Sequence, residues 1–66
     1  MQVSKVNGIT LTLSENDAKK LRRVCGFNKT VSGKIASNSD EASGAAVDAF
    51  LYQLGSALRE KGIERF

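Results

Sequence analysis

The stretch Gln2-Val-Ser-Lys-Val-Asn-Gly-Ile-Thr-Leu-Thr-Leu13 decides how the fold begins. Its centre, Asn7-Gly8, is the favoured pair for a two-residue β-turn, because both residues tolerate positive φ angles. The run Ile9-Thr-Leu-Thr-Leu13 that follows alternates apolar and polar residues with the period of a half-buried strand. The sequence therefore predicts a β-hairpin at the N-terminus.

A two-residue turn would fix the register of this hairpin. It pairs Val6 with Ile9, Ser4 with Leu11, and Lys5 with a threonine on the opposite face. One face is then largely apolar and the other rich in threonine. Because an isolated two-stranded hairpin is marginal in water, we expect it to lie against helices or to pair with another chain through its open edges.

A first helix is predicted to begin after Ser14. Ser14 is a good N-cap, and Glu15 and Asp17, which follow it, suit the positive first turn of a helix. Ala18, Leu21 and Cys25 form an apolar stripe at helical spacing. Gly26 is suited to the left-handed position that ends a helix.

A second, longer helix is predicted from about Ser39 to Lys61. Asn38, with Glu41 three residues later, resembles a capping box. The apolar stripe of this helix consists of Val47, Leu51, Leu54 and Leu58. Gly62 is expected to end it in a Schellman motif, with Ile63 folding back onto the last turn.

The length of this second helix predicts self-association. It would be roughly 34 Å long at 1.5 Å per residue, whereas a compact chain of this size spans roughly 28 Å. Because one copy would not cover the helix, we expect a homodimer or higher oligomer in which second helices pack together. The fold class expected is α+β: one domain over residues 1–66, with a β-hairpin followed by two helices (ββαα).

Residues 26–37 leave two alternatives open. Thr30-Val-Ser-Gly-Lys-Ile35 is compatible with a second small hairpin around Ser32-Gly33 and with an ordered loop. The segment is long for a connection in so small a domain, and long connections are often functional.

Composition narrows the class of protein. The chain of 66 residues has one cysteine and no histidine, which excludes an internal disulfide and a structural zinc site. No apolar run approaches the roughly 20 residues that span a bilayer, and the N-terminus lacks a signal-peptide layout. We therefore expect a cytoplasmic protein without a membrane partner, in which Cys25 is a small buried hydrophobe.

The charge is unevenly distributed. The formal net charge is +3, yet the segment from Ala18 to Ser39 contains no acidic residue. Its basic residues are Lys19, Lys20, Arg22, Arg23, Lys29 and Lys34. Such a block either attracts a phosphate-bearing partner or is simply a solvated surface.

Two candidate ligand sites follow from local patterns. Ser32-Gly33-Lys34 offers backbone N–H groups and an ammonium to an anion, although the spacing around it does not match a nucleotide-binding P-loop. On the second helix, Asp48, Tyr52, Gly55 and Arg59 share a narrow arc. This arc suits a flat ligand through stacking and bidentate hydrogen bonds; the alternative is an ordinary exposed face with Tyr52 at an oligomer contact.

Glycines within the second helix need a compensating role. Gly44 and Gly55 each cost about 1 kcal/mol relative to alanine in a helix. Either they allow the close approach of a backbone or a flat ligand, or they are tolerated surface residues.

Catalysis has little support, because no histidine is present and no serine or cysteine has a recognisable general base. We expect a protein that is not an enzyme.

The chain resembles short phage and prophage accessory proteins in three features. These are the hairpin, the helix that begins Ser14-Glu-Asn-Asp-Ala18 and ends at Gly26, and the later Phe50-Leu-Tyr52. Some proteins of that kind are anti-defence factors, including sponges that sequester cyclic-nucleotide immune signals in basic pockets at oligomer interfaces. The resemblance implies a nucleotide second messenger as partner. The residues suited to such a pocket are Arg22, Arg23, Lys34, Tyr52 and Arg59.

A second resemblance is to ribbon–helix–helix DNA-binding proteins, in which a strand pairs across a dimer and enters the major groove. Thr10 and Thr12 would then face the DNA. The pairing of this strand within its own chain, and a connection of about a dozen residues between the two helices, depart from that pattern. An inhibitor that docks on a host protein is a further alternative.

Overall fold

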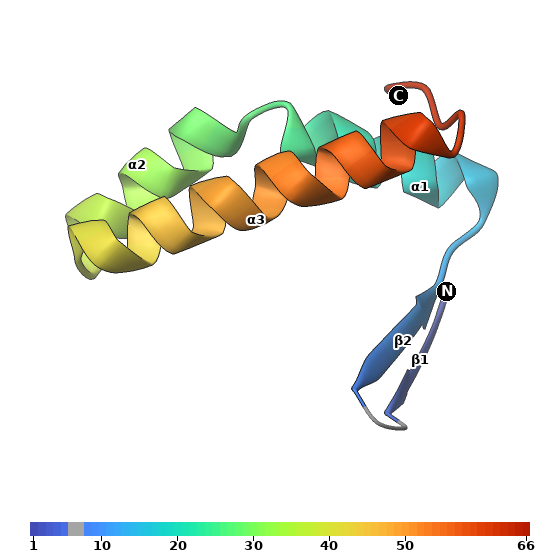
Figure 1. Cartoon of the computed structure of the whole chain (residues 1–66), viewed down its shortest axis with the longest axis horizontal. Helices are drawn as coiled ribbons and strands as arrows, with labels where there is room; N and C mark the ends of the chain where they lie inside the picture. The colour runs from blue at the N-terminus through green and yellow to red at the C-terminus, as the bar shows by residue number, and fades with distance from the viewer. Residues whose placement is uncertain (6–7) are drawn as a thin grey trace.

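The fold is α+β, with an N-terminal antiparallel hairpin followed by helices, as expected from the sequence. The computed structural model describes residues 1–5 and 8–66. The elements are β1 (Gln2–Lys5), β2 (Ile9–Thr12), α1 (Glu15–Cys25), α2 (Asn28–Asn38) and α3 (Glu41–Glu60). Figure 1 shows the hairpin projecting away from a layer of three helices, one more helix than predicted.

The hairpin register differs by one residue from the expected one. Lys5 pairs with Ile9 and Val3 with Leu11, so three residues rather than two separate the paired ends. The predicted pair of Val6 with Ile9, and Asn7 of the predicted turn, lie outside the described residues. Gly8 has a φ of 125°, a region that side chains other than glycine rarely enter.

This register separates the side chains more cleanly than the predicted one. Because opposite residues in an antiparallel pair share a face, Val3, Ile9 and Leu11 lie together on one side of the hairpin with Lys5. The other side carries Gln2, Ser4, Thr10 and Thr12. The three apolar side chains are 46% to 73% exposed, so the helices of the same chain do not cover them.

Helix α1 begins as predicted and ends differently. The Ser14 hydroxyl oxygen accepts a hydrogen bond from the backbone N–H of Asp17 at 3.1 Å. Ala18 and Cys25 are buried. Gly26 is not left-handed, since its φ is −69° and ψ −15°. The chain continues into α2 after Phe27, so no reversal of direction is required at Gly26.

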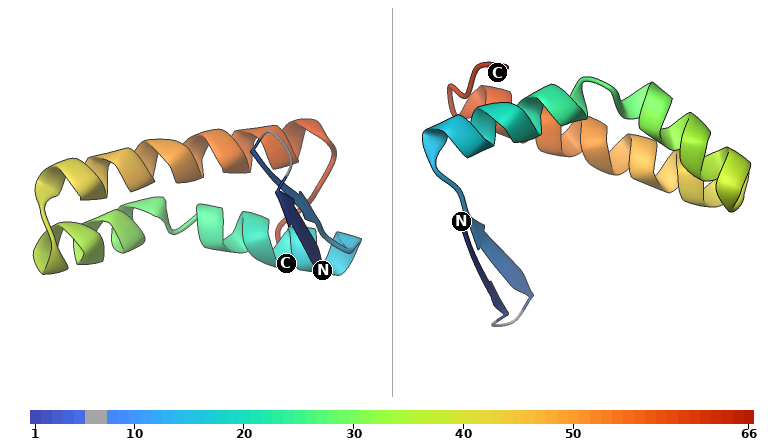
Figure 2. Two further views of the ribbon diagram at one scale, coloured as in Figure 1. Left: turned by 90° about the horizontal axis from the view of Figure 1, so that it is seen from below. Right: turned by 180° about the vertical axis from the view of Figure 1, so that it is seen from behind.

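The segment Asn28–Asn38 is helix α2, which makes both sequence interpretations of residues 26–37 wrong. Its sequence is a poor helix former, with β-branched residues, Gly33 in the middle and no side-chain N-cap. Packing against α3 provides the stability that the helix propensity of this segment does not. Val31 and Ile35 are half-buried, and α2 runs along the N-terminal half of α3 (Figure 2).

Helix α3 starts at Glu41, two residues later than the predicted start at about Ser39. Asp40, not Asn38, is the N-cap, and its carboxylate accepts from the Ser43 backbone N–H at 2.6 Å. The Schellman ending is confirmed: the N–H of Ile63 reaches the Leu58 carbonyl at 3.1 Å, and Gly62 has a φ of 80°. None of the described helices combines the length and the hydrophobicity needed to cross a membrane.

Helices α1 and α2 lie end to end along one side of α3 (Figure 2). One copy of the chain therefore covers the whole length of α3 on that side. The expectation that one copy would not cover this helix is wrong for that side. The core is nevertheless thin. Among the described residues, the buried apolar side chains are those of Ala18, Cys25 and Leu51.

The glycines of α3 mark its closest contacts with the other two helices. A Cβ atom on residue 44 would lie 2.6 Å from the Ser32 carbonyl oxygen of α2. One on residue 55 would lie 3.0 Å from the Cβ of Cys25 in α1. Both glycines therefore serve close helix packing, which was one of the two readings of the sequence.

We predict opposite effects of the same substitution at two helical glycines. Gly44→Ala should lower the free energy of unfolding by about 1–3 kcal/mol, because the added methyl group overpacks the contact with α2. Gly33→Ala should raise it by up to about 1 kcal/mol, since a Cβ there meets no atom within 4 Å. Urea denaturation measures both. Equal stability of the two variants would contradict the packing role of Gly44.

Candidate functional site

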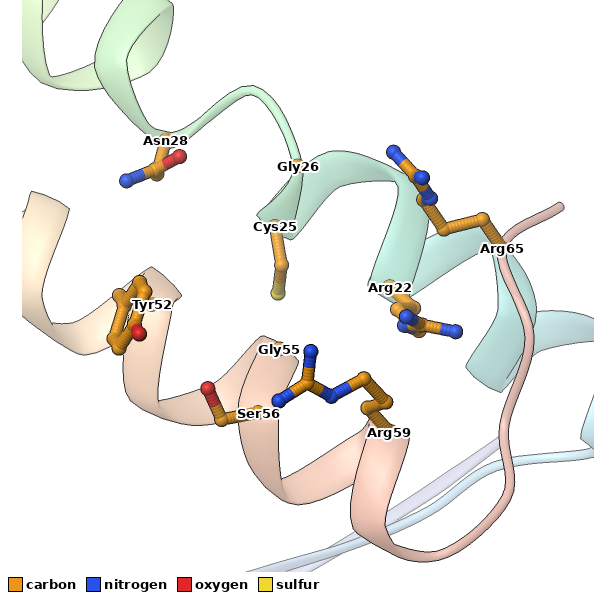
Figure 3. A pocket seen from close by; sticks show the side chains of 9 residues that line it. All are labelled: Arg22, Cys25, Gly26, Asn28, Tyr52, Gly55, Ser56, Arg59 and Arg65. Atoms are coloured by element: carbon orange, nitrogen blue, oxygen red, sulfur yellow. The ribbon is translucent and has the colours of Figure 1, made fainter.

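A pocket of about 200 Å³ opens where α1 passes into α2 opposite the C-terminal half of α3. Three arginines, Arg22, Arg59 and Arg65, line one part of it, and Asn28 and Tyr52 line the other. Figure 3 shows these two groups of side chains on opposite sides of Cys25. The pocket thus combines a cluster of guanidinium groups with an aromatic ring.

The C-terminal segment completes this pocket. The Arg22 guanidinium donates to the Ile63 carbonyl oxygen at 2.6 Å. The Phe66 backbone N–H donates to the Lys19 carbonyl at 3.1 Å, and the Lys20 ammonium lies 5.3 Å from the centre of the Phe66 ring. These contacts hold residues 63–66 against α1, which brings Arg65 to the rim beside Gly26.

Among the described residues that line the three-arginine pocket, none is acidic. Within the described part of the chain, none of its guanidinium groups forms an ion pair with a carboxylate. Arginine presents a planar fork of N–H donors that matches a phosphate or carboxylate. Three guanidinium groups without a carboxylate partner among the described residues are therefore suited to an anion, and the Arg22 group is already held by the Ile63 carbonyl.

The floor of the pocket is inert. Cys25 is buried and faces Gly55, whose lack of a side chain leaves room for it. Burial raises the pKa of the Cys25 thiol. Because the thiolate is the reactive form of cysteine, the raised pKa lowers the reactive fraction of Cys25 at neutral pH.

A second pocket of about 370 Å³ adjoins the first. Asn28 and Tyr52 line both pockets. In the second, the Asp48 carboxylate is bound by two donors of α2: the Lys29 ammonium at 2.5 Å and the Asn28 side-chain amide. The hydrogen bond from Lys29, followed by that from Asn28, lowers the pKa of Asp48. Its negative charge is thus matched locally and does not oppose an anion next door.

The structure brings together part of the predicted site. Arg22, Tyr52, Gly55 and Arg59 all line the three-arginine pocket, and Asp48 lines its neighbour.

The other predicted residues lie elsewhere. Arg23 is exposed on α1 and lines neither pocket. Ser32, Gly33 and Lys34 lie in the middle of α2, where backbone N–H groups are used within the helix. The anion-binding loop expected there is therefore absent.

Five lining residues were not found as site residues from the sequence: Cys25 and Gly26, which were expected only to form and end the first helix, and Asn28, Ser56 and Arg65. Asn28 lay in a segment without a predicted structure. Arg65 follows the Gly62 reversal, and that reversal was the one available signal that the C-terminal segment folds back onto the helices. Ser56 carried no signal. Comparisons with protein-family models, with curated proteins and with solved structures gave no match, so the geometry alone supports this site.

The Asp48 contacts predict a loss of stability in acid. A carboxyl group whose pKa is lower in the folded than in the unfolded chain stabilises the fold above the unfolded value. This contribution is lost as the pH falls from about 4 through the lowered value of Asp48. Asp48→Asn should therefore flatten the pH dependence of the unfolding free energy below about pH 4.

The control for that experiment is Glu60→Gln. Glu60 is exposed on the same helix and has no hydrogen-bonded or ionic side-chain partner among the described residues. It should leave the acid limb of the curve unchanged. An equal flattening by the two variants would show that the contacts of Asp48 with α2 do not stabilise the folded chain.

Proposed function

We propose that the protein binds a phosphate-bearing nucleotide, without catalysis, and that the three-arginine pocket holds the phosphate groups. The observation that carries this proposal is the meeting of Arg22, Arg59 and Arg65 beside Tyr52, with no carboxylate among the described residues that line the same pocket. Charge-assisted hydrogen bonds from guanidinium groups are among the strongest available to a phosphate.

The size of the pocket indicates how a nucleotide would lie. At about 200 Å³ it is smaller than the roughly 300–1,000 Å³ typical of small-molecule sites. It has room for one or two phosphate groups. The base would extend past Tyr52 into the adjoining pocket of about 370 Å³. The Tyr52 ring is 69% exposed and available for stacking.

The same features favour capture over turnover. The Cys25 thiol has a raised pKa, and among the described residues no group of His, Cys, Asp or Glu is placed to hold a metal ion. We infer that the chain acts by sequestering its ligand in the cytoplasm, as the resemblance to phage anti-defence proteins implies for a cyclic nucleotide signal.

A second candidate function is DNA binding by the hairpin. The side chains of Gln2, Ser4, Thr10 and Thr12 form an exposed polar face of a two-stranded ribbon, and such ribbons enter the major groove in some DNA-binding proteins. Only the residues 26 and 27 separate α1 from α2, so the long connection that counted against a ribbon–helix–helix protein does not exist. The pairing of β1 with β2 within one chain still departs from that fold.

Binding is tested by calorimetry with a cyclic dinucleotide, with ATP and with inorganic pyrophosphate. We expect nucleotides to bind and to raise the melting temperature. Arg59→Gln and Arg65→Gln should each weaken binding about ten- to a hundredfold, the amount that one hydrogen bond to a charged group supplies. Arg23→Gln is the matched control, because Arg23 neighbours the pocket in sequence but does not line it.

Tyr52→Ala separates the two parts of the ligand. It should weaken nucleotide binding and leave pyrophosphate binding unchanged. If no nucleotide binds, or if Arg23→Gln weakens binding as much as Arg59→Gln, the proposal fails. Tight binding of duplex DNA with a steep dependence on salt, lost in Thr10→Ala, would favour the second candidate.

A further inference from the structure

The side of α3 that is turned away from α1 and α2 carries almost no charge. Between Ala42 and Leu58 the helix has one charged residue, Asp48, and its carboxylate is bound by donors of α2. The exposed residues on this side, here called the outer face of α3, are Ala42, Ala46, Ala49, Phe50, Gln53 and Ala57, with Glu60 in the last turn. A surface helix normally carries polar and charged residues on the side opposite its core, so this mostly apolar side is suited to a further partner.

The chain also exposes more surface than its mass requires. Its accessible surface is 5162 Å², whereas a compact monomer of 7.1 kDa exposes about 4,100 Å² by the scaling of surface with mass. The excess is roughly 1,000 Å². A stable protein interface buries about 800 Å² of each partner. The projecting hairpin, whose two strands are exposed throughout, and the outer face of α3 both contribute to the excess.

We propose that the outer face of α3 packs against the same face of a second copy of this chain, with the two α3 helices antiparallel. Alanine side chains allow two helix axes to approach closely, in the way that Gly44 and Gly55 do within the chain. Phe50, which is 60% exposed, lies at the middle of α3 and becomes buried near the two-fold axis. A self-complementary patch of this kind is the ordinary basis of a two-fold dimer.

Charge at the helix ends selects the antiparallel orientation. The N-terminal end of α3 carries the carboxylates of Asp40 and Glu41, and the C-terminal end is followed by Lys61 after Arg59 and Glu60. An antiparallel pair brings the acidic end of one helix to the net basic end of its partner. A parallel pair places like charges and like helix-dipole ends together.

The dimer would also close the nucleotide site, a consequence that rests on the proposed function. Ala49 and Gln53 belong to the outer face and line the second pocket. Tyr52 stands at the border between that face and the three-arginine pocket. A second copy on the outer face therefore forms the missing wall beside the Tyr52 ring. The dimer itself does not depend on a ligand.

Sedimentation equilibrium of the full chain tests the interface. We expect a dimer, with Ala46→Glu and Phe50→Glu each raising the dissociation constant at least a hundredfold, because each buries an unpaired carboxylate. Thr30→Glu, on the exposed surface of α2, is the matched control and should leave the dimer intact. Circular dichroism confirms that each variant stays helical.

Two results would overturn the proposal. One is a strictly monomeric wild-type chain at millimolar concentration. The other is a dimer that survives both α3 variants but is lost in Ile9→Lys, which would place the interface on the apolar side of the hairpin.

Orientation is tested by exchanging charges. Glu41→Lys and Lys61→Glu should each weaken the dimer several-fold at low salt, and the double variant should restore it, as expected only of an antiparallel pair. A double variant weaker than either single variant excludes that orientation. Calorimetry with pyrophosphate and a cyclic dinucleotide on wild type and Phe50→Glu separates the two proposals. If the wild-type chain is a dimer but binds no nucleotide, the proposed function is wrong and the proposed interface stands.

Discussion

The close approach of α3 to the other two helices is the constraint on which the structure depends. It is made at two glycines, Gly44 against the Ser32 backbone and Gly55 against Cys25. Each glycine lowers the stability of the helix in isolation. Each offsets this loss in the folded chain, because it lets the backbones of neighbouring helices meet without an intervening side chain. Because few side chains of the described residues are fully buried, these two close contacts add to the polar contacts that Asp48 and the C-terminal segment make between the helices.

The same contacts set the position of the candidate site. Because Gly55 allows Cys25 to lie against α3, the end of α1 is held beside the last turns of α3. Arg22 and Arg59 therefore share one pocket. The Gly62 reversal then returns the chain across α1, where Ile63 accepts from Arg22 and Phe66 pairs with Lys19. Arg65 arrives at the pocket as a result of that path.

The three-arginine pocket places three guanidinium groups of the same charge around one opening. Elsewhere in the described chain, the Asp48 carboxylate is paired with Lys29, and the capping carboxylate of Asp40 is paired with the start of α3. The pocket keeps its positive charges without such partners. A phosphate-bearing ligand would therefore both occupy the site and stabilise the fold, by the linkage between binding and unfolding. Self-association through α3 would act in the same direction by covering apolar surface.

The sequence by itself determined the elements that carry strong local signals. The hairpin, the Ser14 cap and the Schellman ending at Gly62 depend on residues next to one another in the chain. It also placed Tyr52, Gly55 and Arg59 on one arc of one helix, because helical period alone decides that. Only the tertiary structure decided the rest. Residues 28–38 are poor helix formers that become α2 because Val31, Ile35 and the Ser32 backbone pack on α3. Arg22 and Arg65 join the arc because contacts distant in sequence, which no local pattern encodes, bring α1 and the C-terminus to α3.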